Sequence, residues 1–74
     1  QGLPVPLGEG AFAIGQTLSV LALDVLSVEV TAIRRRNSQT LEPYAQLQLE
    51  AGDVLVLLGT PAALSSAEDK LLRG

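Results

Sequence analysis

The side chains of this chain that could do chemistry are eight carboxylates, five basic groups and a few hydroxyls. The 74 residues contain no histidine, which removes the commonest general base near neutral pH and the commonest metal ligand. They contain no cysteine, which removes thiolate metal sites and disulfides. Catalysis would rest on carboxylates, Ser or Thr hydroxyls, Lys70 or Tyr44, and no nucleophile–base pair or metal cluster is visible among them. The sequence therefore predicts a protein that is not an enzyme, without catalytic, metal-binding or cofactor-binding residues.

Two groups of neighbouring carboxylates could still contact a ligand or a cation. Glu50 and Asp53 flank a glycine turn, and an Asp in such a turn ordinarily accepts backbone N–H groups of the turn itself. We therefore expect turn chemistry for Asp53 and a solvated Glu50. Glu68 and Asp69 are adjacent in an expected helix, where neighbouring residues do not share a face. Without a histidine beside them, they are not expected to form half of a metal site.

The basic residues gather in one run, Arg34-Arg35-Arg36, which could bind an anion or contact anionic lipid. Attraction to a lipid surface is about 1 kcal/mol per basic residue. Alternation along a strand sends neighbours to opposite faces, which favours arginines that are solvated or paired across an interface. Tyr44, beside Pro43, could stack on a ligand at a dimer cleft, but its more ordinary role is to cover the edge of the core with its hydroxyl in water.

Composition excludes several classes of partner. The net charge of −3 and the two aromatic residues, Phe12 and Tyr44, argue against nucleic-acid binding, which requires a basic surface and stacking platforms. No apolar run approaches the ~20 residues of a membrane span. The length fits one domain over residues 1–74, and the absence of methionine predicts that the chain is a fragment of a larger protein.

The first half of the chain predicts a strand, a helix and further strands. Leu3–Leu7 alternates apolar residues with prolines, as in an edge strand, because both prolines remove N–H donors from the same side. Thr17 can cap a short helix over 18–23, which Asp24 ends. The β-branched run Val28–Ile33 predicts a strand. A polar turn over 34–38 and a short strand at Thr40-Leu41 follow.

The second half gives the clearest signals. After Leu47 and Leu49, which alternate with polar residues, a turn at 51–53 leads into the strand Val54–Leu58. Thr60 caps the following helix, with Pro61 at its first position, where the missing N–H has no cost. The helix carries an apolar stripe of Leu64, Ala67, Leu71 and Leu72, and Gly74 suits its C-terminal cap. The order strand-helix-strand-strands-helix predicts a small two-layer α+β domain with a mainly antiparallel sheet.

The strand Val54–Leu58 is apolar on both faces. Val54, Val56 and Leu58 point one way, whereas Leu55 and Leu57 point the other. Helices in a two-layer domain cover one face only, and burying each such side chain is worth about 1.5–3 kcal/mol. We therefore expect a partner, either a second copy or the rest of the parent chain, to cover the other face. This places a dimer interface on the strand, with Val54, Leu55, Val56, Leu57 and Leu58 as its residues.

These residues together resemble the C-terminal regulatory domain of potassium-conductance regulators, called the TrkA-C or RCK C-terminal domain. The most specific similarity runs from Leu49 to Pro61, and the resemblance extends over nearly the whole chain. The supporting segments are Gly15 with Thr17-Leu18, Val30 to Arg35, and Glu42-Pro43. The segments 29–36 and 67–74 are similar to the version at the C-terminus of bacterial monovalent cation:proton antiporters of the glutathione-regulated type. One departure is Ser27, where the family often has glycine, and it affects only the turn before the second strand.

The resemblance implies a regulatory and dimerisation domain, preceded by a Rossmann-type nucleotide-binding domain, on the cytoplasmic face of the bacterial inner membrane. The parent would be a cation transporter, first of all a potassium:proton antiporter. A potassium-uptake gating subunit, another carrier, or a free-standing module that binds a small ligand remains open. No G-x-G-x-x-G follows a strand here, so binding of NAD or ATP through that motif is not expected. Some relatives bind a cyclic dinucleotide or a divalent cation between two such domains, and no residue of this chain is assigned to such an effector.

Overall fold

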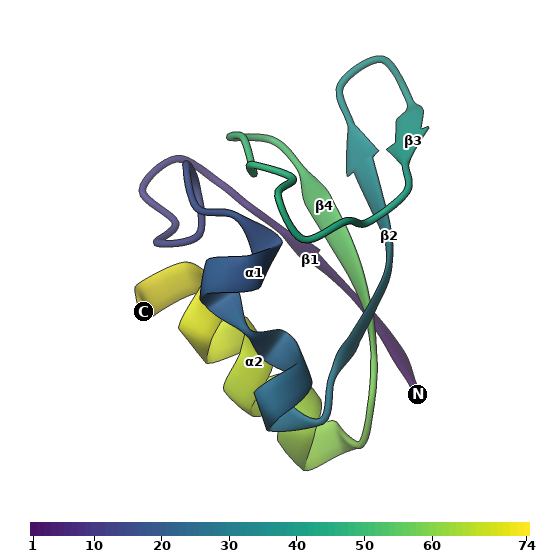
Figure 1. Cartoon of the computed structure of the whole chain (residues 1–74), viewed down its shortest axis with the longest axis vertical. Helices are drawn as coiled ribbons and strands as arrows, with labels where there is room; N and C mark the ends of the chain where they lie inside the picture. Colours follow the sequence, from purple (N-terminus) through teal and green to yellow (C-terminus); the bar gives the residue numbers. More distant parts are fainter.

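The computed structural model describes residues 1–74 and has two layers, an antiparallel sheet with helices on one of its faces (Figure 1). The strands are β1 (Gly2–Pro6), β2 (Glu29–Arg35), β3 (Gln39–Leu41) and β4 (Val54–Leu58), in the spatial order β1-β4-β2-β3. The helices are α1 (Leu18–Leu21), the 3₁₀ helix η1 (Leu23–Leu26) and α2 (Pro61–Arg73). The predicted small two-layer α+β class is confirmed.

The proline-rich first strand lies at an edge of the sheet, as predicted. β1 pairs with β4 only, and Pro4 and Pro6 lie opposite Val56 and Val54. Proline is tolerated in a sheet where its missing N–H would point away from the neighbouring strand. The free edge of β1 therefore lacks two donors that another strand would need.

The core lies between the sheet and the helices. Leu55 and Leu57 of β4 are fully buried on the helical side, where Val5 and Ile33 flank Leu55 in the two neighbouring strands. Fourteen apolar side chains form one buried cluster: Val5, Leu7, Ala13, Leu21, Leu23, Val28, Ile33, Leu47, Leu49, Leu55, Leu57, Leu64, Ala67 and Leu71. The core is wholly aliphatic, so packing of branched side chains stabilises the layers.

Local capping defines α2 as predicted. The Thr60 hydroxyl accepts the backbone N–H of Ala63 at 3.2 Å, and Pro61 takes the first helical position. At the other end, the Gly74 N–H donates to the Lys70 carbonyl at 2.9 Å. Three of the four residues of the predicted stripe are buried, and Leu72 is partly buried. None of the helices is both long and apolar enough to span a membrane.

The prediction for the first helix is wrong at its C-terminal end. Thr17 caps α1 as expected, with its hydroxyl accepting the Val20 N–H at 3.3 Å. The helix ends at Leu21, however, because Ala22 adopts a left-handed conformation (φ 50°). Asp24 does not end α1; it lies inside η1, which ends at a second left-handed residue, Ser27 (φ 63°).

Strand boundaries also differ from the sequence-based expectation. β1 and β2 are displaced by one or two residues, and Arg34 and Arg35 belong to β2 rather than to a turn. The turn consists of Arg36 to Ser38, in which Asn37 and Ser38 have positive φ. The alternating stretch around Gln48 forms no named strand, only an isolated bridge with Thr17.

Candidate functional site

The outward face of the sheet is an uncovered apolar surface. Val54 and Val56 of β4 and Ala32 of β2 are only partly buried, and none of them packs against the core cluster. Leu58, at the end of β4, keeps 44% of its surface exposed. The outer face, as we call this surface, also includes Pro4 and Pro6 of β1, which lie beside Val56 and Val54. Residues paired across antiparallel strands point to the same side, so these six side chains form one patch.

The structure divides the five residues predicted for a dimer interface. Leu55 and Leu57 are fully buried in the chain's own core and are not accessible to a partner. The other three, Val54, Val56 and Leu58, point outward. An uncovered apolar patch rimmed by polar residues is typical of an interaction surface.

Two charged residues frame the outer face. Glu29 lies opposite Leu58 in the β2–β4 pairing, and Arg34 lies opposite Val54. Both side chains are exposed. Between them the strand is irregular, because Thr31 is an extra residue between Val30 and Ala32 whose hydroxyl donates to the Val56 carbonyl at 3.1 Å.

A partly buried ion pair lies on the inward side of β2. The Arg35 guanidinium donates from Nε to Asp53 Oδ1 and from Nη2 to Asp53 Oδ2, both at 3.0 Å. Arg35 also donates to the Gln48 carbonyl at 3.0 Å and pairs with Glu50 at 3.3 Å. Asp53 accepts the Glu50 N–H at 2.9 Å, so the predicted turn chemistry is confirmed. Asp53 is the one buried charged residue, and every oxygen of its carboxylate has a donor.

These contacts change both pKa values. Burial alone raises the pKa of Asp53, but the hydrogen bonds from Arg35 and from the Glu50 backbone, with the charges of Arg35 and Arg36, lower it below its ordinary value of 3.8. The hydrogen bond to Asp53 raises the pKa of Arg35 above its ordinary value. Both groups are therefore ionised at neutral pH, and the pair ties the end of β2 to the turn before β4.

The sequence predicted the role of Asp53 but not its partner. Alternation correctly separates Arg34, which is exposed on the outer face, from Arg35, which turns inward. Glu50 is exposed as expected, although it also pairs with Arg35. Nothing in local spacing connects Arg35 with Asp53, because 18 residues separate them.

An open hollow lies beside α1. Its walls are Leu18, Ser19, Asp24, Pro43, Tyr44 and Ala45, and its volume is about 400 Å³. A second hollow of about 300 Å³ adjoins it through Leu18 and Asp24 and is mainly apolar. Tyr44 is 57% exposed and lines the first hollow. Such volumes accommodate a small molecule.

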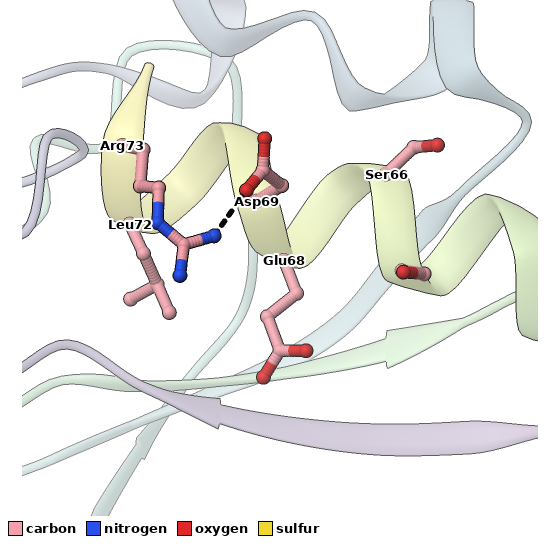
Figure 2. A pocket seen from close by; sticks show the side chains of 6 residues that line it. Ser66, Glu68, Asp69, Leu72 and Arg73 are labelled. Carbon is pink, nitrogen blue, oxygen red and sulfur yellow. Dashed lines mark hydrogen bonds and ion pairs between the residues drawn. The ribbon is translucent and has the colours of Figure 1, made fainter.

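A third hollow lies along the exposed side of α2 (Figure 2). Figure 2 shows Glu68 and Asp69 pointing in different directions, in agreement with the expectation that they do not share a face. Asp69 pairs with Arg73, one turn further along the helix. No group of three or more potential metal-ligating side chains occurs in the structure.

The family of this chain follows from a match over nearly its full length. The TrkA-C domain matches residues 5–72, almost the full length. The chain belongs to the TrkA-C domain family. Domains of this family are regulatory, non-catalytic modules, and they are linked to potassium transport. The resemblance seen in the sequence is thereby confirmed.

One curated protein that is similar to this chain is named as a transporter. Over 63 residues, the chain is 36% identical to a protein of Alkalimonas amylolytica named "Putative K(+) efflux antiporter KefB". The similarity covers 85% of this chain and 10% of that protein. The chain therefore spans about a tenth of the length of this relative.

Solved structures share the fold at low sequence identity. The RCK_C domain dimer of S. agalactiae BusR, in complex with c-di-AMP, has a TM-score of 0.80 and 12% identity, with 95% of this chain and 93% of that chain covered. The RCK C domain of the potassium transport protein KtrA, also in complex with c-di-AMP, has a TM-score of 0.81 and 22% identity, with 93% and 80% covered. At these identities the similarity establishes the fold alone.

Proposed function

We propose that this TrkA-C domain is the regulatory and pairing module of a bacterial potassium:proton antiporter. In this account residues 1–74 form one domain of a longer chain with a Rossmann-type nucleotide-binding domain and a transmembrane domain. The domain works at the cytoplasmic face of the inner membrane, and it pairs with a second copy. The observation that carries the proposal is the family match over residues 5–72, and the KefB relative favours an antiporter among potassium systems.

The pairing surface in this proposal is the outer face, through Val54, Val56 and Leu58. These side chains are apolar and uncovered in the single copy, whereas the opposite face of the same strand is fully buried. Covering Leu and Val side chains on association is favourable by the same hydrophobic effect that stabilises the core. The BusR relative is described as a dimer, which supports pairing as a property of this fold.

The charged residues that line the two hollows beside α1 are carboxylates, which limits the ligands that these hollows can bind. A cyclic dinucleotide carries two phosphodiester anions, and the BusR and KtrA domains were solved with c-di-AMP. Asp24 is the charged residue of the first hollow, and Asp24 and Glu29 line the second. Carboxylates repel phosphates, so we expect this hollow to be a poor site for a cyclic dinucleotide.

The alternative is the same domain in a potassium-uptake gating subunit, in another carrier, or as a free-standing ligand-binding module. The sequence of the parent chain distinguishes these cases. A series of long apolar spans upstream supports the antiporter, and their absence contradicts it.

Pairing is tested with the double variant Val56→Thr/Leu58→Thr. Threonine keeps the β-branch that strands favour, so the fold is retained while the outer face becomes polar. We expect sedimentation equilibrium to show at least about tenfold weaker dimerisation, which corresponds to about 1.4 kcal/mol. The matched control is Val20→Thr, since Val20 is an exposed valine on α1. If the control weakens pairing and the double variant does not, the proposed interface is wrong.

Effector binding is tested by thermal shift of the 74-residue chain. We expect Asp24→Asn to leave any change in Tm with c-di-AMP unaltered, because the hollow beside α1 is not expected to bind the nucleotide. A larger increase in Tm with c-di-AMP in Asp24→Asn than in wild type would place the nucleotide in this hollow and contradict the charge argument.

A further inference from the structure

We propose that the open edge of β2 over residues 29–32, with the hollow beside it, binds an extended segment of a partner protein that carries basic and aliphatic residues. The bound segment adds a fifth strand to the sheet. This inference goes beyond the proposed function, because it concerns a surface other than the outer face and a partner other than a second copy of the domain.

β2 has a neighbour on both sides along only part of its length. β4 pairs with it from Glu29 to Arg34, whereas β3 pairs with Ile33 to Arg35 alone (Figure 1). The segment after β3, residues 42–53, forms no named strand that could take the place of β3 beside 29–32. Backbone groups of 29–32 that point away from β4 therefore have no partner strand. A strand edge of this kind is a template for an added strand.

The mainly apolar hollow of about 300 Å³ lies along this open edge. Val28, Glu29 and Val30 line it from the start of β2, and Leu18 and Leu23 line it from the two short helices. When a segment binds by strand addition, backbone hydrogen bonds provide affinity, and pockets for alternate side chains provide specificity. The hollow is such a pocket, and its apolar lining fits an aliphatic side chain of the added strand.

The charge of the site determines which segments fit. Asp24 and Glu29 are exposed, and they are the only charged residues that line either of the two hollows beside α1. Neither carboxylate forms an ion pair within the chain. Complementary charges across an interface favour one partner and fix its register, whereas like charges are unfavourable. The partner segment is therefore expected to carry Lys or Arg beside its aliphatic residue.

Other edges and other occupants complement the sheet less well. The free edge of β1 lacks N–H donors at Pro4 and Pro6, and no hollow borders the three residues of β3. A second copy at the open edge of β2 would bring its own Asp24 and Glu29, so carboxylates would approach carboxylates. A basic extended segment matches the edge in hydrogen bonding, in the apolar pocket and in charge.

The test is a titration of the ¹⁵N-labelled 74-residue chain with the synthetic peptide acetyl-Lys-Val-Thr-Val-Lys-amide, followed by two-dimensional NMR. We expect the amide signals of Val28, Glu29 and Val30 to shift, while those of Ser65 and Ser66 on α2 stay constant. One control peptide has Glu in place of both Lys and should bind at least about tenfold more weakly. In the other, the three interior residues are N-methylated, so both of its edges lose donors, and we expect no binding.

Charge variants of the chain test the two carboxylates. The double variant Asp24→Asn/Glu29→Gln keeps the size of both side chains and removes both charges, so we expect it to bind the Lys peptide at least about tenfold more weakly than wild type. The matched control is Glu68→Gln/Asp69→Asn, which removes two carboxylates from α2 and should bind within about twofold of wild type.

The outcomes separate this inference from the proposed pairing. Equal binding of the N-methylated peptide, equal binding by Asp24→Asn/Glu29→Gln, or no shift at millimolar Lys peptide would overturn the inference and leave pairing through the outer face untouched. If the signals of Val28, Glu29 and Val30 shift with the concentration of the chain alone, a second copy occupies the edge, and both proposals are wrong. Peptide binding by a chain that stays monomeric supports the inference and overturns the pairing.

Discussion

Arg35 and Asp53 form the contact that joins the two halves of the chain. Asp53 is buried and accepts two hydrogen bonds from the Arg35 guanidinium. Arg35 also contacts the Gln48 carbonyl and Glu50. Gln48 in turn donates to the Gly15 carbonyl at 2.9 Å, which reaches the segment before α1. One polar network therefore fixes the position of three loops around an otherwise aliphatic core.

Removal of the Asp53 charge should destabilise the domain. In Asp53→Asn, Arg35 loses its bidentate partner, because the NH2 group of the asparagine amide is a donor that faces an N–H donor of the guanidinium. We expect a loss of about 2 kcal/mol in the free energy of unfolding, less than for a fully buried pair because the Arg35 side chain is 21% exposed. Urea denaturation measures it. The control is Asp69→Asn, which breaks an exposed pair on α2 and should cost at most about 0.5 kcal/mol. Equal losses in the two variants would refute a special role for Asp53.

The same pair predicts how stability depends on pH. The folded pKa of Asp53 lies below its ordinary value of 3.8, so the folded state binds fewer protons than the unfolded state in acid. Its contribution is therefore complete above about pH 5, and it is lost as the pH falls through 3.8 and then through the lower folded pKa. Urea midpoints from pH 7 to pH 2 should fall more steeply in wild type than in Asp53→Asn. Parallel curves would show that Asp53 does not carry the acid sensitivity.

The elements that the sequence predicted well carry their own local signals. β4 and α2 have a glycine turn, an apolar run and a Thr-Pro start, all within a few residues, and both were predicted correctly. The α1–η1 segment lacks such signals, because the left-handed residues that shape it are Ala22 and Ser27 rather than glycines. The Arg35–Asp53 contact and the exposed Tyr44 depend on how distant segments meet, so spacing could not reveal them.

The connection between η1 and β2 can be tested at Ser27. Ser27 adopts the left-handed conformation (φ 63°), which glycine adopts without steric cost. Ser27→Gly should therefore keep the turn before β2 and raise the free energy of unfolding by about 0.5–1 kcal/mol, measured by urea denaturation. Ser19→Gly in α1, where glycine only adds chain entropy, should lower it by a similar amount. Destabilisation by Ser27→Gly would show that the serine side chain itself stabilises this turn.

The whole molecule is a small two-layer domain in which one face of the sheet is uncovered. Helices cover one face of the sheet, and 15 of 74 residues are buried, so the core is modest and the outer face has no cover within the chain. One side of β4 builds the core, and in the proposed pairing its other apolar side contacts a second copy. Regulation by pairing then follows if an effector stabilises one arrangement of the pair more than another.

The most direct test of this account is a dilution series of the ¹⁵N-labelled 74-residue chain, followed by two-dimensional NMR. Amide signals that change with concentration belong to the interface between copies. We predict that the changes centre on Val54, Val56 and Leu58 and extend to Ala32 and Arg34, while Ser65 and Ser66 on α2 stay constant. Changes that centre on α1 and η1, with a constant outer face, would contradict the account.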